Sequence, residues 1–274
     1  GIDMNIIILT GRFGMGHIKA AEAIREQILE ENRNHNVEII DFMDYMFPSF
    51  SKLIYRGFNF LVSSCSGLYN MLNKAAGGNG TVPLKVAFTK KIDKLIEEHR
   101  ADIIVVAFPV CSQYISAYKK MRRVDIPLYT YITDITAHEE WIAPGTDLYF
   151  VGDERTKNTL LSKGVKEEKI IVSGIPVKKR FYEDYTGEKK SRKEILVMGG
   201  GLGLLPSSDK LLKKLNEIND IHTTLIAGKN EKLLGEVRRK YENIEAIGYT
   251  EQVDLYMKRA DLIITKAGGI TTFE

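Results

Sequence analysis

Cysteine is scarce in this sequence, and long apolar runs are missing. The 274 residues include only Cys65 and Cys111, which excludes a disulfide framework and is typical of a reducing compartment. The best candidate for a membrane span, residues 53–72, carries Arg56, Asn59 and several serines, so no clean span is present. The apolar run at residues 6–9 is too short for a signal peptide.

Acidic residues are absent between Tyr45 and Ile92, whereas basic and aromatic residues interleave there. Such a composition suits an anionic membrane surface, and the alternative is a packed helix pair that happens to lack acids. No recognised nucleic-acid motif accompanies the segment, so nucleic acid is not expected as a partner. The side chains expected to face a membrane are Lys52, Arg56, Phe58, Phe60, Lys90 and Lys91.

Short β-branched runs alternate with segments of helical periodicity, which predicts an α/β fold with parallel sheets. A polar, charged stretch at residues 178–194 interrupts the pattern and is typical of a linker. We therefore predict a first lobe at residues 4–180 and a second at 194–274. In the first lobe we expect strands at 4–9, 37–42, 102–108, 127–133 and 147–153, helices at 18–31, 48–73, 86–99, 111–121 and 154–162, and a glycine-rich break at 75–83.

The second lobe restarts with a strand and a glycine-rich loop at residues 195–206. Three helices, at 209–218, 231–241 and 253–259, alternate with strands at 222–228 and 244–248 and with a strand and loop at 260–269. The chain stops at Glu274, in what we expect to be the first turn of a helix. We therefore expect the second lobe to be incomplete at its C-terminal end.

The stretch "GRFGMGH", residues 11–17, lies where the first expected strand hands over to a helix. Glycines allow a sharp turn and close approach to a ligand, and the N–H groups at a helix start attract negative charge. The glycine spacing does not fit the dinucleotide fingerprint, and no Gly-Lys-Ser/Thr follows as in a P-loop. A histidine at a helix N-terminus tends to stay neutral, so His17 is a candidate general base. A plain strand-to-helix turn is the alternative.

Two loops of the second lobe have a related composition. "MGGGLGLLP", residues 198–206, follows an apolar strand directly. "TKAGGITTFE", residues 265–274, combines a Gly-Gly turn, two threonines and a helix start, which together predict an anion pocket. Glu274 would accept hydrogen bonds from a ribose diol, or would simply cap the helix.

Together these residues carry a family resemblance. The "GMGH" turn, the "GGG.G" loop and the "K.GG.T..E" loop look like those of sugar-nucleotide glycosyltransferases with the GT-B fold. More narrowly, the chain resembles the monogalactosyldiacylglycerol synthase and processive diacylglycerol glucosyltransferase family in "HIKAAEAI", "YITDITAHEEWIAPGTDLYFVGDE" and "VSGIPV". Family members usually show Gly-Gly-Gly-His in the first loop, and Phe13 and Met15 depart from that pattern.

The resemblance implies a GT-B fold, with two Rossmann-like, doubly wound lobes facing a cleft. It implies UDP-glucose or UDP-galactose as donor, diacylglycerol as acceptor, no cofactor, and a cytoplasmic protein peripheral on the inner face of the cell membrane. The acceptor side would include Gly14, Gly16, His138 and Trp141. The donor would be bound by Gly199, Gly200, Gly201, Gly203, Gly248, Tyr249, Gly268, Gly269, Ile270, Thr271 and Glu274.

Sugar transfer needs a base for the acceptor hydroxyl and positive charge or N–H groups for the departing diphosphate. No carboxylate pair of the DxD type stands out to hold a divalent metal, so we expect metal-independent, inverting transfer. We expect Asp134 to take the proton, with His17 orienting it or contacting the donor, and His17 as base is the alternative. Asp134 as a turn residue, His138 as a core or surface residue and Trp141 as packing remain alternatives.

Three other functions fit the same motifs. A UDP-sugar epimerase uses a similar two-lobed fold, and a glycosyltransferase acting on a polyprenyl lipid would differ only in its acceptor. A sensor would bind a UDP-sugar without transferring it. Transfer of labelled sugar to diacylglycerol distinguishes the predicted activity from all three.

Overall fold

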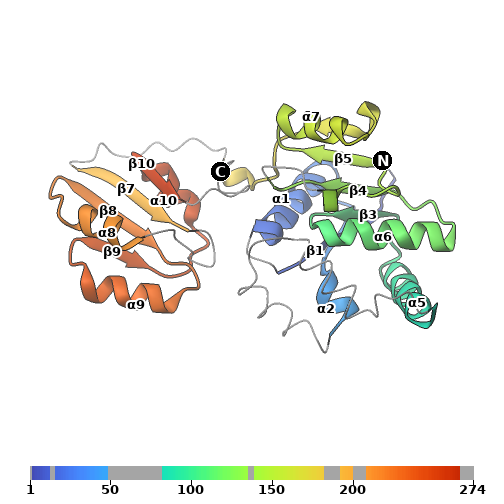
Figure 1. The fold of residues 1–274 in the computed structure, drawn as a ribbon, viewed down its shortest axis with the longest axis horizontal. Coiled ribbons are helices and arrows are strands. Elements are labelled where there is room, and N and C mark those ends of the chain that lie inside the picture. Colours follow the sequence, from blue (N-terminus) through green and yellow to red (C-terminus); the bar gives the residue numbers. More distant parts are fainter. Residues whose placement is uncertain are drawn as a thin grey trace. The chain divides into compact units, whose positions relative to one another are not determined.

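The computed structural model describes residues 2–12, 16–48, 82–134, 139–181, 192–199 and 208–265. The chain divides into two compact units, with His17–Val177 in the first and Lys178–Glu274 in the second. Each unit is built on one parallel sheet (Figure 1). The predicted α/β fold with two parallel-sheet lobes is therefore confirmed.

The first sheet has six parallel strands in the order β2-β1-β3-β4-β5-β6. Its strands are β1 (Asn5–Thr10), β2 (Asn36–Asp41), β3 (Ile103–Val106), β4 (Leu128–Tyr131), β5 (Leu148–Val151) and β6 (Ile170–Val172). The accompanying helices are α1 (Gly16–Glu31), α2 (Phe42–Met46), α5 (Val82–His99), α6 (Pro109–Arg122) and α7 (Glu154–Ser162), with short 3₁₀ turns η1 (Glu139–Trp141), η2 (Glu167–Lys169) and η3 (Lys179–Phe181).

Strand β1 shows why this sheet is covered on both faces. Successive side chains of a strand point to opposite faces. Ile6 and Ile8 pack with α1, whereas Ile7 and Leu9 join a second core with helices α2, α5 and α6. All four are buried, so the run is apolar throughout, as expected for a central parallel strand.

The second sheet has four parallel strands in the order β10-β7-β8-β9. They are β7 (Lys193–Met198), β8 (Ile221–Ile226), β9 (Ile244–Ile247) and β10 (Leu262–Thr265), with helices α8 (Ser208–Asn216), α9 (Glu231–Lys240) and α10 (Val253–Arg259). One core packs the sheet against α8 and α9, and another packs it against α10. The chain therefore winds outward from β7 to β9 and returns on the other face to place β10 beside β7.

Several predicted boundaries are wrong. Helix α5 begins at Val82, inside the break predicted at 75–83, and Pro83 is tolerated there because the first helical turn does not need its N–H. Phe42 begins helix α2 instead of ending a strand, because the Asp41 side chain accepts hydrogen bonds from Met43 N and Asp44 N and so starts a helix. The predicted helix at 48–73 lies outside the described residues, except for its first residue.

A helix that crosses a bilayer has to be both long and apolar. Among the residues that the structure describes, no helix meets both requirements.

Candidate active site

Three loops meet at the carboxyl edge of the first sheet. In the order β2-β1-β3, the chain moves outward from β1 to β2 and then returns to β3, so the helices that follow β1 and β3 cover opposite faces of the sheet. Such a switch point is the usual ligand position in an open parallel sheet. His17 follows β1, Ala107 and Phe108 follow β3, and Asp134 follows β4.

His17 is half-buried and held through its Nδ1 atom. That nitrogen lies 3.0 Å from the Ala107 carbonyl oxygen and 3.2 Å from Thr133 Oγ1. A carbonyl oxygen only accepts hydrogen bonds, so Nδ1 carries the proton and Nε2 carries the lone pair in the neutral ring. Thr10 Oγ1 also donates to the His17 carbonyl oxygen at 3.0 Å, which ties the first turn of α1 to the end of β1.

Burial lowers the pKa of His17 below its ordinary value of 6.5. The nearby Asp134 carboxylate and the hydrogen bond to Ala107 oppose part of this shift. The edge of the imidazole also packs on Phe108, with ring centroids 5.0 Å apart. The neutral imidazole is thus favoured, with one defined nitrogen able to accept a proton.

Asp134 is half-buried and is held by Trp141. The indole Nε1 donates to Asp134 Oδ2 at 2.8 Å. Trp141 is fully buried, and its ring centroid lies 6.5 Å from that of His17. The structure therefore brings together three residues that the sequence analysis singled out. The acceptor contact predicted for Trp141 stays a prediction, because the contact observed is with Asp134.

Sequence reasoning missed the groups that hold His17. The Ala107 carbonyl is a backbone group, so no side-chain pattern could have revealed it. Thr133 precedes Asp134 directly in "YITD" and carries a hydroxyl, so its position after a strand was a usable signal. Gly16, the first residue of α1, is exposed, whereas Gly14 and His138 lie outside the described residues.

The second sheet also has a switch point, between β7 and β10. Met198 and Thr265, the last residues of these strands, are paired in register. Both glycine-rich loops therefore start side by side at one carboxyl edge, which is where a parallel sheet places ligands. Gly199, the first loop residue, is buried. The other predicted donor residues of the two loops lie outside the described residues: Gly200, Gly201, Gly203, Gly268, Gly269, Ile270, Thr271 and Glu274.

Gly248 and Tyr249 follow β9 at the far edge of the same sheet. Tyr249 is 40% exposed, with Lys229 Nζ lying 5.3 Å from its ring centroid. Its hydroxyl donates to Glu251. An exposed aromatic ring is thus available at this edge, and its predicted contact with the donor stays a prediction.

Two of the residues predicted to face a membrane lie on α5. Lys90 is exposed. Lys91 is also exposed, but its Nζ donates to the Met46 carbonyl oxygen at 2.6 Å and so caps the end of α2. Lys52, Arg56, Phe58 and Phe60 lie outside the described residues. Within the described part of the chain, no group of three or more His, Cys, Asp or Glu residues is arranged to hold a metal ion.

Comparison with protein families gives two matches that cover both lobes. A family model described as monogalactosyldiacylglycerol (MGDG) synthase matches residues 17–177, which is more than half of the chain. A second, described as the glycosyltransferase family 28 C-terminal domain, matches residues 194–274. The boundary between the matches lies in the stretch where the predicted linker and the division into compact units also fall.

Similar individual proteins point the same way. The chain is 27% identical to the processive diacylglycerol beta-glucosyltransferase of Bacillus licheniformis over 99% of its length and 74% of that protein. It is 26% identical to the enzyme of the same name from Bacillus subtilis, over 99% of its length and 75% of that protein.

Among solved structures, MurG of Acinetobacter baumannii superposes with a TM-score of 0.54 at 12% identity, covering 97% of this chain and 72% of that one. A UDP-GlcNAc 2-epimerase from Neisseria meningitidis gives a TM-score of 0.53 at 14% identity, covering 96% and 77%. The GT-B fold is therefore confirmed, and because an epimerase shares it, the fold alone does not decide the reaction.

Proposed function

Because the chain belongs to the monogalactosyldiacylglycerol synthase family, we propose that it transfers glucose or galactose from a UDP-sugar to diacylglycerol. The chain is a glycosyltransferase, with a family 28 C-terminal domain in its second lobe. The names of the Bacillus relatives support diacylglycerol as acceptor and favour glucose over galactose.

One observation in the structure carries the proposal. At the switch point of the first sheet, the Asp134 carboxylate is oriented by Trp141 and lies near the His17 imidazole, whose favoured neutral form carries its lone pair on Nε2. Removal of a proton from a hydroxyl needs such a group near the reacting oxygen. A protein that only sensed a UDP-sugar would need no base at this position.

The proposed reaction is a single displacement at the anomeric carbon. The hydroxyl oxygen of diacylglycerol attacks that carbon and its proton passes to the Asp134 carboxylate. The bond from the anomeric carbon to the UDP oxygen breaks, and its electron pair leaves with UDP. Attack opposite the leaving group inverts the configuration. His17, held by Ala107 and Thr133, orients Asp134 or contacts the donor, and its Nε2 lone pair makes it the alternative base.

On the donor side, we propose that the loops after β7 and β10 receive the diphosphate. Their starting points are adjacent at Met198 and Thr265, and α8 follows the first of them. Backbone N–H groups at helix starts stabilise phosphate charge without a metal. Tyr249 and Gly248, which follow β9 at the far side of the same sheet, are proposed to lie against the uracil.

We further propose that the enzyme works at an anionic membrane surface, on the cytoplasmic side. The acid-free segment between Tyr45 and Ile92 supports this, because basic and aromatic side chains together favour anionic lipid headgroups. Lys90 on α5 is an exposed member of the set.

The test is a transfer assay with the full-length protein. Radiolabelled UDP-glucose and UDP-galactose are each offered with diacylglycerol in micelles that contain anionic or zwitterionic lipid, with and without EDTA. We expect a labelled glycolipid, faster with anionic lipid, insensitive to EDTA, and of the β-anomer by NMR. Free labelled sugar or epimerised donor without glycolipid would refute the proposal.

Matched variants distinguish the effect on kcat of substitutions at the site from that of the same substitutions elsewhere at the sheet. Asp134→Asn and His17→Ala should each lower kcat at least about 100-fold, as expected for removal of an acid–base group. Asp102 and His35 provide the controls, because both bind backbone N–H groups at the opposite edge of the same sheet. Asp102→Asn and His35→Ala should leave kcat near the wild-type value. Wild-type rates in both site variants would remove the proposed mechanism.

A further inference from the structure

We propose that Gln113, on α6, is a positioning residue for Asp134 and acts through Trp141. The inference rests on the proposed function, in which Asp134 takes the proton of the acceptor. It concerns a residue that contacts neither the base nor the reacting atoms. Hydrogen bonds from α6 to the backbone on both sides of Trp141, and from the Trp141 indole to the Asp134 carboxylate, support it.

The first step is the contact between Gln113 and the η1 segment. Gln113 Nε2 donates to the carbonyl oxygen of Glu140 at 3.1 Å and to that of Ile142 at 2.6 Å. These are the carbonyls of the residues immediately before and after Trp141. One amide group therefore holds the backbone on both sides of the tryptophan.

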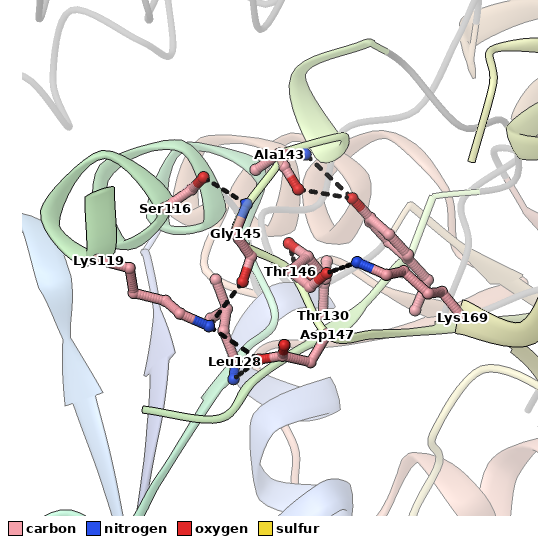
Figure 2. Close-up of polar contacts among 10 residues, drawn as sticks. Ser116, Lys119, Leu128, Thr130, Ala143, Gly145, Thr146, Asp147 and Lys169 are labelled. Atoms are coloured by element: carbon pink, nitrogen blue, oxygen red, sulfur yellow. Dashed lines mark hydrogen bonds and ion pairs between the residues drawn. The ribbon is translucent and has the colours of Figure 1, made fainter. Parts of the chain in front are cut away.

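The second step is the anchoring of the following loop to the same helix face. Ser116 Oγ accepts from Gly145 N at 2.7 Å, and Lys119 Nζ donates to the Gly145 carbonyl at 2.8 Å and to Asp147 Oδ2 at 2.9 Å (Figure 2). Gln113, Ser116 and Lys119 are spaced three residues apart, so they lie along one side of α6. Helix α6 thus provides a rigid support along the segment from Glu140 to Asp147.

The third step is the indole itself. The Trp141 ring is fully buried in a core with Ile132, Tyr149 and Leu160. A buried N–H without a partner is energetically costly, so the indole favours the one carboxylate orientation that accepts from it. The observed bond to Asp134 Oδ2, at 2.8 Å, is the charge-assisted kind, which is short and directional.

These steps explain how Asp134 can be held accurately although it sits on a loop. Misplacement of a reacting group by about 1 Å costs on the order of 100-fold in rate. A rigid helix supports the backbone around Trp141, and Trp141 aligns the carboxylate. Gln113 therefore acts on the rate of the chemical step and not on substrate affinity.

The chain offers a direct reporter, because Trp141 is its only tryptophan. The indole N–H gives a single resonance in an NMR spectrum of the ¹⁵N-labelled protein. Asp134→Asn, which removes the charged acceptor, defines the position of that resonance without the charge-assisted bond. In Gln113→Met, which keeps the side-chain size but has no donor, we expect the resonance to move toward that position and the N–H to exchange faster with solvent.

The kinetic arm uses the same variants in the transfer assay. We expect Gln113→Met and Trp141→Phe to lower kcat by about 10- to 100-fold with both KM values within about twofold of wild type. Gln27→Met is the matched control, because it makes the same change at an exposed position of α1, and it should keep kcat. Trp141→Phe provides a second kinetic test should Gln113→Met fail to fold.

The outcomes distinguish this inference from the proposed function. An indole resonance of Gln113→Met that coincides with that of wild type would overturn the positioning role. So would a wild-type kcat in Gln113→Met when Asp134→Asn is inactive. A wild-type kcat in Asp134→Asn would instead count against the proposed base, and the NMR comparison would still decide whether Gln113 positions Asp134.

Discussion

Replacement of Gly145 by alanine tests the close packing of α6 against the loop that follows Trp141. A Cβ added at Gly145 would lie 2.9 Å from Ser116 Cα, 2.9 Å from Ser116 Oγ and 3.1 Å from Ser116 Cβ. Ser116 Oγ could rotate away, but Cα belongs to the helix backbone. The loop or the helix therefore has to shift.

The magnitude follows from the contacts that the shift would strain. Overpacking of this kind costs about 1–3 kcal/mol. The hydrogen bonds of Gly145 to Ser116 and Lys119 would lengthen at a net cost of about 1 kcal/mol. Alanine restricts the unfolded chain more than glycine does, which favours the folded state by about 0.4–1 kcal/mol. We expect Gly145→Ala to lower the free energy of unfolding of the first unit by about 2 kcal/mol.

Urea denaturation followed by tryptophan fluorescence measures this change directly. The only tryptophan, Trp141, belongs to the first unit, so the signal reports that unit even if the second unfolds separately. With a denaturant slope of about 2 kcal/mol/M, the midpoint should fall by about 1 M. Gly235→Ala is the control, because Gly235 lies in α9 and an added Cβ would meet no described residue from outside its own stretch of helix within 4 Å. It should leave the Trp141 transition unchanged.

A midpoint for Gly145→Ala at or above the wild-type value would refute the reasoning. It would mean that α6 and the loop have room between them, contrary to the 2.9 Å approach. A lowered midpoint in Gly235→Ala would show that the fluorescence signal does not isolate the first unit.

Three further outcomes are expected. Because folding lowers the pKa of His17, the imidazole is protonated more readily in the unfolded chain, so the free energy of unfolding should fall as the pH drops below about 6.5. Urea midpoints measured from pH 5 to 7.5 should fall less steeply with decreasing pH in His17→Asn than in wild type. Lys119→Met should lower the free energy of unfolding by about 2 kcal/mol, which is less than the loss of a fully buried ion pair would cost, because the Asp147 side chain is 42% exposed. An unchanged urea midpoint would contradict this. Gly164 follows α7 with a φ of +87°, a backbone conformation in which alanine is strained, so Gly164→Ala should lower the urea midpoint by the equivalent of about 1 kcal/mol. A raised midpoint would exclude that strain.

The sheet architecture was predictable because it depends on local patterns. The apolar runs that became β1, β3 and β7 are short, β-branched and followed by turns, and each lies where a strand was expected. The long charged stretch near residue 185 predicted a linker in the same way, and the lobe bounds derived from it stay a prediction. Boundaries were less accurate at Phe42 and Val82, because single hydrogen bonds and a tolerated proline decide where a helix begins.

The candidate site was predictable only in part. His17 and Asp134 stand out in sequence, because each is a titratable residue directly after an expected strand. The sequence does not say that they lie near each other, since they come from loops after β1 and β4, more than a hundred residues apart. Gln113 carried no signal at all, because a glutamine on a helix is ordinary until its partners are known.

The sequence by itself determined the two α/β lobes, the glycine-rich turns and the family, since these depend on residue types and their spacing along the chain. Only the tertiary structure decided that Ala107 sets the tautomer of His17 and that Trp141 orients Asp134. It also decided that Gln113 holds the backbone around that tryptophan. The reason is physical, because hydrogen bonds between loops depend on strand order and backbone position, and neither is written in the local pattern.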